Sequence, residues 1–362
     1  MARASRANAP RIGAAAVLLG AWVSLVGLSW DIQWHGDVGP DTFFTWPHLA
    51  LYSGSALSGI ASLVMVLRST AAQRAGRDFP RYAGGSPVRV FGGTFHAPLG
   101  YLVSGVGAAL FLLYGLLDLW WHTVYGFDAT LSTPSHVALF LSISLTMIGS
   151  IVVFAAARDQ RWGRAGLLLA IAVFIVFGPI PFAGLDALDL PIDATLIGVL
   201  LCAPTLLIMG AVLLGRWAAV GIAVVLGAAQ AFLWWFSPWA TEAYASFVGL
   251  PLRDGLRHDT PGLPNTIPMF LIVAALAVEG LLSLGRSGRL RPPVLVPLTG
   301  ALAGTLIGTG LTVQFALVRE SGFLDASTVA PVALAGLVLG LVAGYLGSRF
   351  AVLLRAAEGE AA

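Results

Sequence analysis

The chain has 362 residues, of which 57% are hydrophobic and 10% are charged, and its formal net charge is +2. A soluble domain carries about 25% charged residues, so this composition excludes a water-soluble core, a disordered chain and a nucleic-acid-binding protein. A single cysteine excludes an intrachain disulfide and any CxxC motif. The sequence therefore predicts an all-α polytopic membrane protein in a lipid bilayer.

Ten apolar stretches are long enough to cross a bilayer as helices, which takes about 20 residues each. The first stretch resembles a signal peptide, but its apolar run is too long and no small-residue cleavage site follows it. We therefore expect about ten transmembrane helices. In chain order they cover about residues 12–34, 47–68, 97–121, 135–157, 165–183, 194–215, 217–237, 266–285, 294–318 and 330–350.

The arginines predict how these spans are oriented. All 20 basic residues are arginines, and 17 of them fall on one side of the membrane if the N-terminus is placed there. Because arginine and lysine are retained on the cytoplasmic side, both termini are predicted to be cytoplasmic, in a plasma-membrane protein. Most acidic residues then lie at the outer side. Either arginine is simply excluded from the outer loops, or the acids form a cation site there.

The first two outer hairpins are copies of one another. Asp31, Trp34, His35, Asp41 and Pro47 recur at a constant offset of 87 residues, as Asp118, Trp121, His122, Asp128 and Pro134. One inserted residue then shifts the counterpart of His48 to His136. Both copies leave and return in the same direction, so the repeat is parallel. It divides the chain into residues 1–164, with four spans, and residues 165–362, with six spans of no predicted role.

Each copy contains a potential metal site with the spacing D-x3-H-x12/13-H. An aspartate and a histidine four residues apart lie on one face of a helix, here in the last turns of an outgoing span. The second histidine follows a proline that marks the first turn of the returning helix. A helical hairpin brings these ends together, so one carboxylate and two imidazoles can converge near the outer boundary. The six predicted ligands are Asp31, His35, His48, Asp118, His122 and His136.

This ligand set suits copper, zinc or non-haem iron, and ligand type alone does not choose among them. The other repeated residues have two interpretations. Asp41 and Asp128 either orient an imidazole or cap a loop, and Trp34 and Trp121 either support the sites or belong to an interfacial aromatic belt. The remaining histidines, His96 and His258, are predicted at a helix start and in an outer loop.

These motifs resemble the membrane subunit of the particulate methane and ammonia monooxygenases that carries a pair of copper sites. The resemblance covers about residues 12–160 and rests on W-H, D-T and P-H at 34–48 and on W-H and T-P-S-H at 121–136. It implies two neighbouring copper sites in the membrane region. Asp31, His35 and His48 match the first site residue by residue. At the second site His122 and His136 match, but Asp118 stands where the family has asparagine.

The resemblance implies a copper-dependent membrane monooxygenase subunit that acts on a small apolar substrate, with monooxygenase subunits as partners. Two alternatives are kept. One is a non-catalytic copper or zinc protein for binding, sensing or delivery, whose partners would be copper-handling proteins. The other is an ion-coupled carrier, because Glu279 is an isolated acid within the eighth span and ionisable residues in spans are often functional.

Overall fold

A computed structural model describes residues 2–39, 42–126, 131–253, 260–287, 292–318 and 326–356. Two short antiparallel strands, β1 (Pro87–Val90) and β2 (Phe95–Pro98), flank the 3₁₀ helix η1 (Phe91–Gly93), and a second 3₁₀ helix, η2 (Ile180–Leu188), follows α5. The α-helices are α1 (Ala2–Asp37), α2 (Trp46–Arg74), α3 (Leu99–Tyr125), α4 (Pro134–Ala155), α5 (Arg161–Phe177), α6 (Ala194–Leu214), α7 (Ala218–Val248), α8 (Gly262–Thr266), α9 (Leu271–Arg286), α10 (Pro292–Val318) and α11 (Ala326–Ala356).

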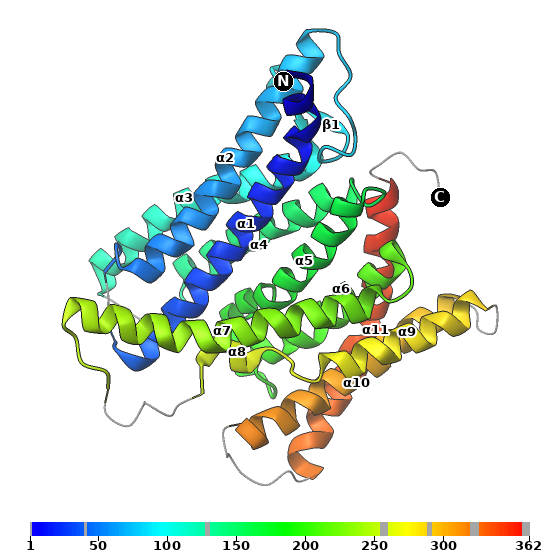
Figure 1. The fold of residues 1–362 in the computed structure, drawn as a ribbon. Helices are drawn as coiled ribbons and strands as arrows, with labels where there is room; N and C mark the ends of the chain where they lie inside the picture. Colours follow the sequence, from blue (N-terminus) through cyan, green and yellow to red (C-terminus); the bar gives the residue numbers. More distant parts are fainter. Residues whose placement is uncertain are drawn as a thin grey trace.

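The predicted class is confirmed. Within the described residues, ten helical segments are long and apolar enough to cross a membrane. Two of them are composite, because α5 continues into η2 and α8 continues into α9. The start of α1 and the end of α11 lie toward the same end of the bundle, as an even number of spans requires (Figure 1). Which end faces the cytoplasm stays a prediction.

Several element boundaries differ from the prediction. Hydropathy predicts that the seventh span ends near residue 237, but α7 continues through Pro238 to Val248. Proline is tolerated inside membrane helices because neighbouring groups satisfy the freed backbone. The segment before the third span forms the β1–β2 hairpin, so His96 is a strand residue paired with Arg89 rather than a helix-start residue.

The sequence repeat extends into the packing of the first two helical hairpins. In the α1–α2 pair, a Cβ atom on Gly20 would collide with Gly54 and Ser58. In the α3–α4 pair, a Cβ atom on Gly107 would collide with Ser142 and Thr146. Gly107 stands 87 residues after Gly20, and Ser142 and Thr146 stand 88 residues after Gly54 and Ser58. Small residues let membrane helices approach closely. The two helices therefore cross at small residues in the same way in both hairpins, so the hairpins are equivalent scaffolds for their ligands.

Close packing through small residues is more extensive in the last hairpin. Glycines at every fourth position of α10 and of α11 bring the two backbones together, so that a Cβ atom on any of them would collide with or press against the backbone of the other helix. The six residues are Gly300, Gly304, Gly308, Gly336, Gly340 and Gly344. One apolar core runs from α1 to α11 through both predicted regions of the chain.

Candidate metal centre

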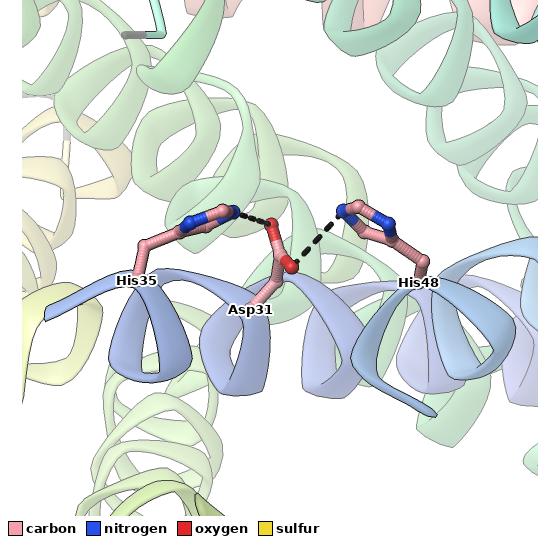
Figure 2. Close-up of side chains that lie close together, drawn as sticks. All are labelled: Asp31, His35 and His48. Atoms are coloured by element: carbon pink, nitrogen blue, oxygen red, sulfur yellow. Dashed lines mark ion pairs between the residues drawn. The ribbon is translucent and has the colours of Figure 1, made fainter. Parts of the chain in front are cut away.

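The ligands of the first site come from the end of α1 and the start of α2. Asp31 and His35 lie one helical turn apart, and His48 is the third residue of α2. Thr45 precedes α2 with an extended backbone, and Pro47 in the first turn favours a helix start there. The Nε2 atoms of His35 and His48 lie 3.7 and 3.1 Å from the two oxygens of the Asp31 carboxylate. Figure 2 shows the carboxylate between the two rings.

The second site repeats this arrangement between α3 and α4. The Nε2 atoms of His122 and His136 lie 3.5 and 3.4 Å from the two carboxylate oxygens of Asp118. Thr133 caps α4 by accepting a hydrogen bond from the backbone N–H of His136. The predicted convergence of one carboxylate and two imidazoles in each hairpin is therefore confirmed, with the candidate ligand atoms of each set within 4.8 Å of one another.

These separations are compatible with atoms that share an ion. Two ligand atoms about 2.0–2.1 Å from a tetrahedral ion lie about 3.3 Å apart. The four nitrogen–oxygen separations, 3.1 to 3.7 Å, fall around that value. The nearer pairs are also not hydrogen bonds, because Oδ1 of Asp31 and Oδ1 of Asp118 accept none. The carboxylate and the two ring nitrogens of each set therefore converge closely enough to bind one ion between them.

Two backbone carbonyls fix the orientation of one ring in each site. Nδ1 of His48 lies 3.0 Å from the carbonyl oxygen of Thr42, and Nδ1 of His122 lies 3.3 Å from that of Gly126. A carbonyl oxygen only accepts, so Nδ1 must carry the proton in both contacts. In the neutral ring Nε2 then presents its lone pair to the aspartate. This is the arrangement by which metal-binding histidines are usually oriented.

The two sites open into one cavity of about 160 Å³, so the expectation that they are neighbours is confirmed. All six predicted ligands line it, and the rest of its wall is mainly apolar, with leucines from α1, α2 and α4. The ligand side chains are between 11 and 20% exposed. A bound ion would therefore sit at a half-buried position, where water is present but competes less than at an open surface.

The repeat also supplies aromatic neighbours to which the sequence reasoning gave no role at the sites. Tyr52 stacks on His48, and Phe140 stacks on His136. Each aromatic residue follows its histidine by four residues, at an offset of 88 residues between the copies. Both residues stand at the same position of the two copies, one helical turn past the second histidine, and that match is the signal that could have assigned them a role. The carbonyls of Thr42 and Gly126 carry no comparable signal, because any residue type offers one.

The other repeated residues have different outcomes. Asp41 and Asp128 lie outside the described residues. Trp34 does not belong to an interfacial belt, since α7 covers it: the side chain is 1% exposed and packs against Tyr244. Trp121 is half-buried and packs against Tyr125, which leaves the belt interpretation standing there.

The remaining candidates do not join the sites. His258 lies outside the described residues, and His96 is in β2. Glu279 is buried and accepts a hydrogen bond from the backbone N–H of Ala219 at the start of α7, with Arg286 3.8 Å away. A carboxylate at a helix start satisfies an otherwise unpaired donor and is stabilised by the helix dipole. This structural contact weakens the case for Glu279 as the centre of a carrier.

Comparisons with protein-family models, with curated proteins and with solved structures find no match for the chain. The interpretation of the site therefore rests on its own geometry.

Proposed function

We propose that the protein is a copper-binding integral membrane protein that holds two ions, one in each Asp/His/His site. The observation that carries this proposal is the presence of two such ligand sets in one cavity, with carboxylate and imidazole atoms facing a shared point. Each aspartate lies 3.1 to 3.7 Å from two ring nitrogens, so the candidate ligand atoms are already gathered where one ion could bridge them.

Copper is the favoured metal among those that suit these ligands. Two imidazoles and a carboxylate can bind copper, zinc or ferrous iron. At a given nitrogen and oxygen site, the affinity of divalent first-row metals peaks at copper, so copper should compete best when the metals are equally available. The motif resemblance to the copper-carrying membrane subunit of the particulate monooxygenases supports the same choice.

We further propose that the sites serve oxidation chemistry as they would in a membrane monooxygenase subunit. Bound copper would supply one-electron redox chemistry with oxygen. The chain itself holds the ligands, orients His48 and His122 through their Nδ1 protons, and surrounds the sites with apolar side chains that limit the entry of water. Reducing equivalents would come from a partner subunit or a membrane quinol, and the arginine distribution would place the sites toward the outside of the plasma membrane.

The alternative without catalysis, a copper-handling protein, uses the same sites and predicts the same first measurement. That measurement is metal analysis of the purified protein after incubation with copper or zinc and removal of loosely bound ions. We expect two copper ions per chain, falling by one in His35→Ala and by one in His122→Ala. His96→Ala is the matched control, because His96 lies in β2 and its side chain joins neither site.

Removal of a ligand should not prevent insertion into the membrane, because the apolar spans drive it. Wild-type protein that is folded but holds no copper, or alanine variants that retain both ions, would refute the proposal. Oxygen consumption by the copper-loaded protein with a reductant then separates catalysis from handling, and the alanine variants serve as its negative controls.

A further inference from the structure

A second cavity lies beside the metal centre and is built by the part of the chain to which the sequence assigns no role. It has a volume of about 440 Å³, within the usual range of small-molecule sites. Its walls come mainly from α5, α6, α8 and α10. Ile32 and Leu131 line both this cavity and the metal cavity, so the two spaces are neighbours.

One wall of this cavity is a break in the eighth span. Between α8 and α9 the chain leaves the helical path at Ile267, and Ile267 and Pro268 line the cavity. Non-helical backbone at membrane depth is tolerated where it is buried in protein or lines a cavity, and transporters bind substrates at such breaks.

Three buried glutamines from distant helices hold this break in place. Gln230 of α7 donates to the carbonyl oxygens of Pro264 and Ile267, at 2.9 and 2.8 Å. Gln314 of α10 also donates to the carbonyl of Ile267, at 3.0 Å, and accepts from the N–H of Met269.

Gln33 of α1 contributes the third contact, by accepting from the backbone N–H of Gly262. Pro268 has no N–H to bond the carbonyl of Pro264, and Gly262 is in the first turn of α8, so these backbone groups need partners from outside the helix. Three amides on three helices supply the partners around this break, and one of them stands two residues after Asp31 on the helix that carries the first metal site.

The chemistry of the cavity changes from its mouth to its interior. The interior is lined by buried aliphatic residues such as Ile175, Val199 and Leu311. Asp193, which is exposed, stands at the rim. Its carboxylate caps α6 by accepting from the N–H of Leu196 at 2.8 Å, which fixes a negative charge at the mouth. This arrangement suits a molecule with an apolar chain and an uncharged polar end, and it disfavours an anion.

We propose that this cavity binds a neutral amphiphile, such as a medium-chain alcohol, with its polar end at Asp193 and its apolar chain directed toward Ile32. Ile32 directly follows the ligand Asp31 and also touches the position that a Cβ atom on Gly262 would take, so it lies where the broken span meets the metal cavity. The far end of the chain would then lie next to the metal sites. Its role as the molecule on which the sites act rests on the proposed function, whereas its binding does not.

The test uses the full-length protein in detergent, stripped of metal with a chelator and then copper-loaded. The probes are octan-1-ol carrying a photoreactive diazirine near its methyl end and octanoate carrying the same group, with labelled residues mapped by mass spectrometry. We expect the alcohol to label Ile32 and its neighbours in the cavity in both metal states. Octanoate should label them about fivefold less, because a second negative charge near Asp193 is repelled.

Three variants define the site. Val199→Trp fills the interior and Thr195→Trp, at a half-buried position near the mouth, blocks entry with less risk to folding. Each should reduce labelling by about tenfold or more, which corresponds to about 1.4 kcal/mol of binding free energy. Leu201→Trp is the matched control, because it lies on the same helix but lines a different cavity. Asp193→Asn keeps the helix cap and should raise octanoate labelling to the level of the alcohol.

Labelling confined to lipid-facing residues, or unchanged in both filled variants, would overturn the proposal. Equal labelling by alcohol and octanoate in the wild type would overturn the assigned polarity. If the protein binds no copper but the alcohol labels the cavity as expected, the proposed function fails while the binding site stands. If the protein binds copper but the alcohol does not label the cavity, the proposed binding site fails while the proposed function stands.

Discussion

Replacing Asp118 with asparagine tests the metal centre most sharply, because it removes a charge and almost no volume. The carboxylate lies 3.4 and 3.5 Å from the two ring nitrogens of its site. Two unit charges 4 Å apart interact by about 4 kcal/mol at the effective dielectric of about 20 that suits partly buried pairs. The amide oxygen can still coordinate, so we expect a net loss of about 2–3 kcal/mol, or about 30- to 150-fold in copper affinity.

The assay is an equilibrium titration of metal-free protein with copper in the presence of a competing chelator. Wild-type protein should fill both sites over a narrow range of free copper. Asp118→Asn should still bind two ions but in two separated steps, with the first site unaffected. Asp159→Asn is the matched control, since it makes the same chemical change in an exposed residue of the turn that follows α4.

An unchanged second step in Asp118→Asn would refute the reasoning, because it would mean that the carboxylate does not face the ion. Loss of both steps in a folded variant would also refute it, since the two ligand sets share a cavity but no residue. The corresponding change at the first site, Asp31→Asn, should weaken copper binding at the first site and leave the second site unaffected.

Three further predictions concern the scaffold. Gly126→Ala should strain the backbone by about 1–3 kcal/mol, because φ there is +84°, and should weaken the second site about 10- to 100-fold by moving the carbonyl that orients its histidine, measured in the same titration. Glu279→Ala should destabilise the protein by about 1–3 kcal/mol, measured by thermal unfolding, because it leaves the N–H of Ala219 without an acceptor. Glu279→Gln keeps an acceptor and should destabilise the protein less. Neither variant should change the copper content. Gly304→Ala should cost about 1–3 kcal/mol because a Cβ atom would collide with the backbone of α11, whereas Gly280→Ala meets open space and should cost nothing.

Hydropathy and the repeat were sufficient to predict the spans and the six candidate ligands. Both signals are local: each span has its own apolar run, and each ligand set lies within one hairpin whose turn brings its ends together. The D-x3-H spacing gave the shared helix face, and Pro47 and Pro134 marked the returning helices. The convergence of the ligands then followed from helix geometry alone.

The features that the sequence did not reveal all depend on contacts between distant segments. Trp34 is buried because α7, some two hundred residues later, covers α1. Glu279 finds its partner at Ala219, across 60 residues. The break at Ile267 follows Pro264, Asn265 and Thr266 and precedes Pro268, so proline and polar residues mark it locally, and the predicted eighth span begins there. What the local sequence does not show is that Gln230 and Gln314 reach this break from other helices.

The shared cavity gives the aspartate at position 118 a physical meaning if the proposed ions bind. Two divalent ions in one half-buried space would repel each other, and four neutral imidazoles would do nothing to offset their charge. One aspartate per site would supply a compensating charge for each ion, whereas asparagine at the second site would leave one ion uncompensated. Because the ligand sets come from parallel copies of one hairpin, a single substitution at position 118 is enough to change the balance between filling one site and filling both. The chain carries aspartate there, and the geometry of its second site closely matches that of the first.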